Sequence, residues 1–244
     1  MNERSLEGKT ILVTGGARRL GRILALACGR AGADVIVHHG HSEEEALEAQ
    51  KEIASIGRRS WVLASDLSNP DEASRLISQA NELSLLYGLV NSAAVFESLT
   101  LENTTLRDWQ RHMDINLTAP FLLSQAFAKQ LPDGRDGRIV NIVDWRALRP
   151  GADHFPYTVS KAALAALTKS LAAALAPRIT VNALAFGAIL PPSDRPATAK
   201  IIENVPAQRW SKPEEVAQAI VFLLSGPAYI TGEIIHVDGG RHLI

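Results

Sequence analysis

Short apolar runs rich in β-branched residues recur along the chain, and between them apolar residues recur at helical spacing. Such runs predict buried strands, whereas the helical spacing predicts helices that bury one face. The predicted strands are Thr10–Thr14, Asp34–His38, Ser60–Ala64, Leu85–Asn91, Arg138–Val143, Arg178–Asn182 and Glu233–Val237. The predicted helices run from Leu20 to about Gly29, from Ser42 to Ile56, from Pro70 onward, from Leu106 to about Leu131, from Tyr157 onward, and from Pro213 to Leu224. Because strands and helices alternate, we expect residues 1–244 to form a single α/β domain, a doubly wound parallel sheet with helices on both faces.

One stretch shows neither pattern. It runs from Ala183 to about Pro206 and contains Pro191, Pro192 and Pro196. A long proline-bearing loop in a compact domain is more often a lid over a site than part of the core. We therefore expect an irregular, lid-like segment here.

Composition narrows the class of protein. The chain has 25 Lys and Arg against 26 Asp and Glu, so no basic field indicates nucleic-acid binding. Its one cysteine, Cys28, excludes an internal disulfide and suits a reducing cytoplasm. No apolar run approaches the ~18 residues of a membrane span, and the polar residues before Thr10 leave no room for a signal peptide. We expect a cytoplasmic protein with no membrane contact and no metal site.

A glycine-rich turn joins the first strand to the first helix, in the order that a Rossmann-type dinucleotide site requires. Gly15 would permit the tight turn, and Gly21 would let the helix lie close against the sheet. Backbone N–H groups at the start of the helix would face a pyrophosphate. An ordinary tight turn is the alternative; the context favours a nucleotide.

The residues after the second strand indicate which nicotinamide cofactor binds. An acidic residue at this place binds the ribose 2′-hydroxyl and repels a 2′-phosphate. Here the chain has His38, His39, Gly40, His41 and Ser42, with no carboxylate before Glu43, while Arg18 and Arg19 lie in the neighbouring turn. We therefore expect NADP(H) rather than NAD(H), although the histidines alone would also fit a solvated loop.

Candidate catalytic residues follow the fifth predicted strand. Asp144 ends that strand, where open α/β sheets place their sites. Tyr157 and Lys161 lie one turn apart on one helix face, and an ammonium beside a phenol would lower the phenol's pKa towards working pH. Tyr157 is thus a candidate proton donor or acceptor. The alternative to a catalytic pair is that Tyr157 and Lys161 have this spacing by chance. The alternative for Asp144 is that it only caps a loop.

Three further features bear on a site. Asn91, Ser92 and Ala93 are small residues that would let a ligand approach the backbone, and Phe96 follows on the same loop. Asn116 lies in the middle of a predicted helix, where asparagine is unfavourable. A buried asparagine there usually has a polar task.

Together these features resemble the short-chain dehydrogenase/reductase family over nearly the whole chain. The similar segments are Thr14–Gly21, Asp66-Leu67, Asn91-Ser92-Ala93, Asn116, Tyr157, Lys161, Trp210–Ala217 and Ile230–Gly240. The resemblance implies that Asp66 and Leu67 contact adenine, and that Leu20, Gly187 and Ile189 also line the cofactor site. It implies that Tyr157 relays a proton, that Lys161 lowers its pKa and holds the nicotinamide ribose, and that Asn116 fixes a water and backbone. It also implies a homotetramer.

Within the family, three residues resemble pteridine reductases. Most members carry Ser in place of Asp144 and Gly in place of Arg19, and Phe96 stands where those enzymes stack a ring on the pterin. The chain departs from them in having His41-Ser42 where they tend to have Arg-Ser. It also has Phe186-Gly187 where Pro-Gly is usual.

This second resemblance implies an NADPH-dependent reductase of pterins or dihydrofolate-like substrates. Asp144 would bind and protonate the ring, and Phe96 would stack on it. Arg19 would lie between phosphate and substrate. The alternatives are a carbonyl or 3-oxoacyl reductase that tolerates Asp144, and a catalytically silent NADP-binding protein.

Overall fold

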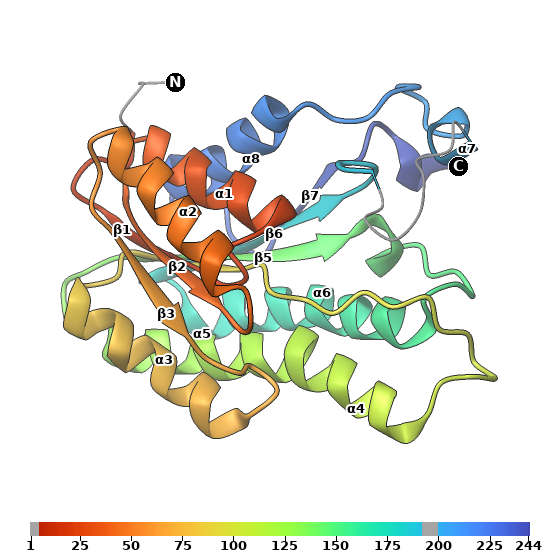
Figure 1. Ribbon diagram of the computed structural model, residues 1–244, viewed down its shortest axis with the longest axis horizontal. Helices are drawn as coiled ribbons and strands as arrows, with labels where there is room; N and C mark the ends of the chain where they lie inside the picture. The colour runs from red at the N-terminus through yellow and green to blue at the C-terminus, as the bar shows by residue number, and fades with distance from the viewer. Residues whose placement is uncertain (1–4, 192–199) are drawn as a thin grey trace.

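The computed structural model describes residues 5–191 and 200–244 and is built around one seven-stranded parallel sheet. The strands lie in the order β3-β2-β1-β4-β5-β6-β7, and every neighbouring pair is parallel (Figure 1). Their bounds are β1 Thr10–Val13, β2 Asp34–His39, β3 Ser60–Ala64, β4 Gly88–Asn91, β5 Gly137–Asp144, β6 Ile179–Phe186 and β7 Ile234–Val237. The order reverses beside β1, so its carboxyl end and that of β4 lie at the topological switch point where such sheets bind ligands. The predicted doubly wound parallel sheet is confirmed.

Helices cover both faces of the sheet (Figure 1). They are α1 Arg19–Arg30, α2 Glu43–Ser55, α3 Pro70–Leu83, α4 Leu106–Met113, α5 Ala119–Gln130, α6 Phe155–Leu175, α7 Lys200–Glu203 and α8 Pro213–Ser225. Helices α1, α2 and α8 lie on one side, and α3, α4, α5 and α6 lie on the other. Of the helices that the structure describes, none has the length and apolar character needed to cross a bilayer.

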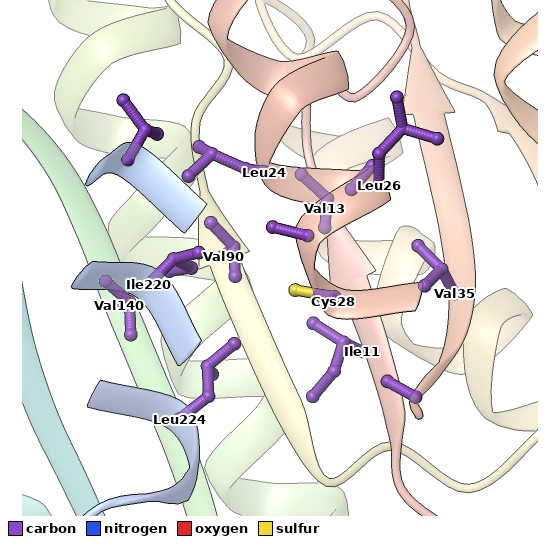
Figure 2. Close-up of a cluster of buried hydrophobic side chains, with 14 of the residues drawn as sticks. Ile11, Val13, Leu24, Leu26, Cys28, Val35, Val90, Val140, Ile220 and Leu224 are labelled. Carbon is purple, nitrogen blue, oxygen red and sulfur yellow. The ribbon is translucent and has the colours of Figure 1, made fainter. Parts of the chain in front are cut away.

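The central strands are buried along their whole length because both faces are covered, which explains their nearly continuous apolar runs. Alternate residues supply two cores. Val13 and Val35 point towards α1 and α8, whereas Leu12 and Ile36 point towards α3 and α5. Figure 2 shows the first core, in which Cys28 packs among aliphatic side chains. Burial raises the pKa of the Cys28 thiol to about 12, so this cysteine is an apolar packing residue.

The sixth strand is longer than the sequence pattern predicts. It continues to Phe186 and pairs with β5 from Gly137↔Ile179 to Asp144↔Phe186, so the expected irregular segment was wrong over Ala183–Phe186. The run Ala-Leu-Ala-Phe is apolar and buried, and it lies between β5 and β7 as a central strand. Of the three prolines on which the lid expectation was based, Pro192 and Pro196 lie outside the described residues.

The predicted helix from Leu106 to Leu131 is also divided. A single π-helical turn, Asp114–Thr118, separates α4 from α5. Asn116 lies in this turn, and Pro120, in the first turn of α5, has no N–H to donate to the helix. Turns of this kind occur frequently at functional sites, and here the turn presents Asn116 to the loop after β4.

Candidate active site

A cleft of about 650 Å³ lies at the carboxyl ends of the central strands. The predicted site residues that line it are Gly15, Arg18, Arg19, Leu20, Gly21, Ser92, Ala93, Phe96, Asp144, Tyr157, Lys161, Gly187 and Ile189. The predicted residues outside its lining are His39, His41, Ser42, Asp66, Leu67, Asn91 and Asn116. The structure therefore brings the glycine turn and the Tyr157–Lys161 pair into one cleft.

The glycine turn is built by close backbone packing. A Cβ on Gly21 would overlap the carbonyl oxygen of Gly15, and a Cβ on Gly15 would lie 2.9 Å from the Cα of Ala93. The turn leads into α1, whose N-terminus receives no side-chain cap from the described residues. Its first N–H groups are thus available to an anion, and the residues present fit a dinucleotide pyrophosphate.

Arg19 occupies a backbone conformation that usually belongs to glycine. Its φ is +48°, in the left-handed region that glycine adopts most readily. The side chain donates a hydrogen bond to the carbonyl oxygen of Pro191 at 2.8 Å. Arg19 thereby joins the glycine turn to the segment that follows β6.

The end of β2 contains a buried histidine that supports the glycine turn. His38 accepts the Gly15 N–H at Nδ1 over 3.1 Å, and its Nε2 lies 3.0 Å from the carbonyl oxygen of Ser65. Burial lowers the pKa of His38 to about 4, so the ring is neutral and donates from Nε2. The sequence offered no signal that separates this structural histidine from its neighbours.

The other predicted cofactor residues at the ends of β2 and β3, where an adenosine would be expected, lie outside the lining of the cleft. His41 is exposed and Ser42 is half-buried, but His39 is only 5% exposed. Arg18 extends towards the start of α2, with 3.7 Å between its guanidinium and the Glu45 carboxylate. Asp66 accepts hydrogen bonds from the N–H and hydroxyl of Ser68, and Leu67 is buried beside it.

Asn91, which is predicted to contact the cofactor, does not line the cleft. Its side chain turns into a buried polar network, where its Nδ2 donates to Asn141 at 2.8 Å and to Ser124 at 3.4 Å. Ser92 and Ala93 do line the cleft, and their N–H groups donate to the hydroxyl of Thr14. The small residues after β4 thus leave room at the cleft, while Asn91 joins strands β4 and β5.

Asn116 performs the backbone part of its predicted role. Its side chain accepts the Val95 N–H at 2.9 Å and donates to the Val95 carbonyl oxygen at 3.1 Å. It also donates to the hydroxyl of Ser160 on α6 at 3.0 Å. This fully buried amide therefore fixes the loop that carries Phe96 against the helix that carries Tyr157.

Tyr157 donates a hydrogen bond from its hydroxyl to Oδ2 of Asp144 at 3.3 Å. Lys161 donates instead to the carbonyl oxygen of Ile142 at 2.7 Å. Burial, with the nearby Asp144 carboxylate, raises the pKa of Tyr157 well above its usual value. Burial also lowers the pKa of Lys161 to about 8. The expectation that Lys161 would lower the pKa of Tyr157 was therefore wrong for the structure as it stands, because desolvation and Asp144 oppose the phenolate.

Asp144 both caps a loop and faces the cleft, so the two alternatives for it are not exclusive. Its Oδ1 accepts the Arg146 N–H at 2.9 Å and lies 3.4 Å from the Arg146 guanidinium. That guanidinium also pairs with Asp153 at 2.7 Å. The carboxylate is held by donors on one oxygen and presents the other to Tyr157.

Several cleft residues were missed by the sequence analysis. Among them are Trp145, Arg146, His154 and Arg241. His154 has a φ of +50°, and its ring stacks on Phe96 with 4.0 Å between centroids. Tyr157 meets Phe96 edge-on at 4.7 Å. His154 thus covers one face of Phe96, whose side chain remains half exposed (53%).

The fold and cleft define a class, a dinucleotide-dependent oxidoreductase with a Tyr-Lys pair beside the central strands. A family model described as enoyl-(acyl carrier protein) reductase matches residues 15–242. The chain is 35% identical over 241 residues to a 3-oxoacyl-[acyl-carrier-protein] reductase of Synechocystis sp., covering 97% of this chain and 98% of that protein. It is 36% identical over 248 residues to the enzyme of the same name from Aquifex aeolicus, covering 98% and 99%.

A solved structure is equally similar. The FolM alternative dihydrofolate reductase 1 of Brucella canis, complexed with NADP, superposes with a TM-score of 0.91 at 34% identity, covering 99% of this chain and 97% of that one. The chain belongs to the short-chain dehydrogenase/reductase family.

Proposed function

We propose that the protein is an NADP(H)-dependent reductase of pterins or dihydrofolate-like substrates. The observation that carries the proposal is the Asp144 carboxylate, whose Oδ2 lies 3.3 Å from the Tyr157 hydroxyl and faces the cleft. The name of the Brucella canis neighbour, a dihydrofolate reductase crystallised with NADP, supports it.

The cofactor would be held along the cleft from the glycine turn to Lys161. The uncapped start of α1 would receive the pyrophosphate, and Arg18, His41 and Ser42 would receive the 2′-phosphate. Asp66 and Leu67 would contact the adenine, and Gly187 and Ile189 the nicotinamide side. When bound, the reduced cofactor supplies the hydride.

Asp144 suits a pterin better than a simple ketone. Reduction of a ketone builds negative charge on oxygen, which a neutral hydroxyl stabilises and a carboxylate opposes. A pterin presents ring N–H and amino donors, which a carboxylate accepts. Because Arg146 already pairs with Asp144, we assign Asp144 to binding these donors rather than to supplying a proton.

The proton comes from Tyr157. A raised pKa keeps the phenol protonated at neutral pH, which is the form that can donate to a ring nitrogen. Lys161 stays charged below its pKa of about 8 and would contact the nicotinamide ribose. Asn116 holds the loop that carries Phe96 through Val95, and it holds the helix that carries Tyr157 and Lys161 through Ser160.

Phe96 is held between His154 and Tyr157, and its ring remains half exposed at the cleft. Offset stacking on the exposed part of this ring would orient a flat substrate. Arg19, whose guanidinium donates to the Pro191 carbonyl oxygen, would lie between the phosphate and the substrate.

A second candidate is a carbonyl or 3-oxoacyl reductase. It is favoured by the relatives from Synechocystis sp. and Aquifex aeolicus, which are both named 3-oxoacyl-[acyl-carrier-protein] reductases. A catalytically silent NADP-binding protein is the third, and the assembled Tyr157, Lys161 and Asn116 argue against it.

Steady-state turnover on a substrate panel separates the three candidates. The panel holds dihydrobiopterin, dihydrofolate, a dihydromonapterin and several plain ketones, each with NADPH. Asp144→Ser removes a charged acceptor for the ring donors, so pterin reduction should fall by about tenfold to a hundredfold, the worth of a hydrogen bond to a charged group, whereas ketone reduction should hold or rise. The matched control is Asp153→Asn, which removes the other carboxylate that pairs with Arg146 and leaves Tyr157 unchanged. This variant should not shift activity from pterins to ketones. Wild-type protein that reduces ketones but no pterin would replace the first candidate with the second.

A further inference from the structure

Two arginines meet on one indole at the substrate end of the cleft. The guanidinium carbon of Arg146 lies 4.7 Å from the Trp145 ring centroid, and that of Arg241 lies 4.5 Å from the same centroid. Trp145 and Arg146 belong to the short 3₁₀ turn after β5, Trp145–Ala147, while Arg241 begins the 3₁₀ turn Arg241–Leu243 near the C-terminus. All three side chains line the cleft that contains Asp144.

The two guanidiniums differ in how their charges are balanced. Arg146 pairs with Asp153 at 2.7 Å and with Asp144 at 3.4 Å. Among the residues that the structure describes, no carboxylate lies within ion-pair distance of Arg241. Asp238, the nearest acid in the sequence, uses its oxygens on the N–H of Gly240 and on His242.

Burial and the repulsion of Arg146 lower the pKa of Arg241. The guanidinium nevertheless stays charged in a protein, so a partly buried positive charge without a close counter-ion faces the cleft. Its remaining N–H donors form a planar fork suited to a carboxylate or a phosphate.

The position of this charge separates it from the expected phosphates of the cofactor. Trp145 follows β5, whereas the glycine turn follows β1, and β4 lies between these two strands. Neighbouring strands are about 4.8 Å apart, so roughly 10 Å separates the two strand ends. The charge lies on the side of Asp144, where the substrate would bind.

We propose that Arg241, seated on Trp145 beside Arg146, binds an anionic tail of the substrate and so determines specificity. The proposal rests on the proposed reductase function and adds the chemistry of the substrate's far end. A carboxylate on a folate-like tail and a phosphate on a carrier-bound acyl chain share this chemistry. The planar indole would pack against the linker that joins the tail to the reacting part.

The test compares tailed and tail-less substrates of the same reacting group. One pair is dihydrofolate and dihydrobiopterin; the other is acetoacetyl-CoA and ethyl acetoacetate. Arg241→Gln should lower the ratio of kcat/KM for the tailed over the tail-less member by about tenfold to a hundredfold, the worth of a hydrogen bond to a charged group. The loss should fall on KM, and Arg241→Lys should restore part of it.

Arg149→Gln is the matched control, because it removes the same charge from an exposed arginine that does not line the cleft. It should leave the ratio as in the wild type. Equal losses on both members of a pair would assign Arg241 a structural role, and an unchanged ratio would exclude contact with the tail; either result overturns the proposal. If only the ketone pair is turned over and its ratio falls, the anion subsite stands while the pterin function fails.

Discussion

The two ends of the cleft differ in whether backbone or side-chain groups form the site. At the glycine turn the site is formed by backbone atoms, because Gly15 lies against Ala93 and α1 begins without a side-chain cap. At the other end it is made of charged and aromatic side chains, among them Asp144, Arg146 and Tyr157. A backbone site can receive the same cofactor in many proteins, whereas the side chains can change singly and alter the substrate. This difference fits a family whose similar members carry names with different substrates.

The largest effect should follow the loss of one hydroxyl at the substrate end. Tyr157→Phe removes the proposed proton donor but no packing atoms besides the oxygen, so turnover should fall by about two to four orders of magnitude. NADPH binding, followed by the quenching of protein fluorescence, should stay close to that of the wild type. Substantial residual turnover would show that the proton comes from another group and that the substrate end does not depend on Tyr157.

At the cofactor end, one added methyl group should be nearly as damaging. Gly21→Ala would place a Cβ on the carbonyl oxygen of Gly15, so the turn or the helix has to shift. Overpacking of this kind costs about 1–3 kcal/mol, and NADPH should bind about tenfold to a hundredfold more weakly. Calorimetric titration measures the affinity.

The control for that change lies in the same helix. A Cβ on Gly29 would meet only side-chain carbons of Ile53 and Ile56, the nearest at 3.3 Å, so Gly29→Ala should retain near-normal affinity for NADPH. If both variants bind NADPH normally, close packing at Gly21 is not what forms the cofactor site.

The site residues at the two ends of the cleft could not be predicted equally well from the sequence, and the reason is physical. Spacing along one strand, turn and helix is local, so Gly15, Gly21, Tyr157 and Lys161 were found and do share the cleft. Arg241 reaches Trp145 only because β5 and the C-terminal turn meet in space, and no local pattern reports that meeting. The sign of the Tyr157 pKa shift failed similarly, because it depends on burial and on Asp144 rather than on helical spacing.

The elements of the fold that the sequence pattern did not predict also depend on contacts between residues that are distant in the sequence. Ala183–Phe186 is a strand because β7 covers its far edge, which the proline-bearing sequence after it concealed. The π-turn at Asn116 exists where a side chain binds a distant backbone at Val95. The alternation of strands and helices needed no such information, and it gave the correct class of fold.

A pH profile should sharpen the comparison by isolating Lys161, which lies at the junction of the two ends. Its ammonium is charged below a pKa of about 8 and neutral above it. The kcat/KM for NADPH should therefore fall about tenfold per pH unit above pH 8, since this parameter reports the free enzyme. Asp144→Asn should move the midpoint to lower pH, because the Asp144 charge raises the pKa of Lys161. A flat profile to pH 9.5 would show that the charge on Lys161 is not needed.

The free energy of unfolding provides an independent test of the lowered pKa of Lys161. Between pH 8 and the usual lysine pKa, the unfolded chain keeps a proton on Lys161 that the folded chain has released. The free energy of unfolding should therefore rise with pH in this window, as measured by urea titration. Lys161→Met should remove that rise, whereas Lys129→Met, on an exposed lysine, should retain it.

The smallest effect should come from the loop after β2, where an exposed side chain would contact the 2′-phosphate. Because His39 is buried, an added carboxylate there would disturb folding as well as binding, so exposed His41 is the better position. His41→Asp should lower the preference for NADPH over NADH by about threefold to fivefold, since exposed charge pairs contribute about 0.2–1 kcal/mol. Raising the salt concentration should shrink the difference. The control Glu44→Gln removes a neighbouring negative charge, whereas His41→Asp adds one. It should therefore raise the preference for NADPH over NADH slightly. A preference that responds to neither variant would place the 2′-phosphate away from this loop, and Arg18 alone would then have to account for it.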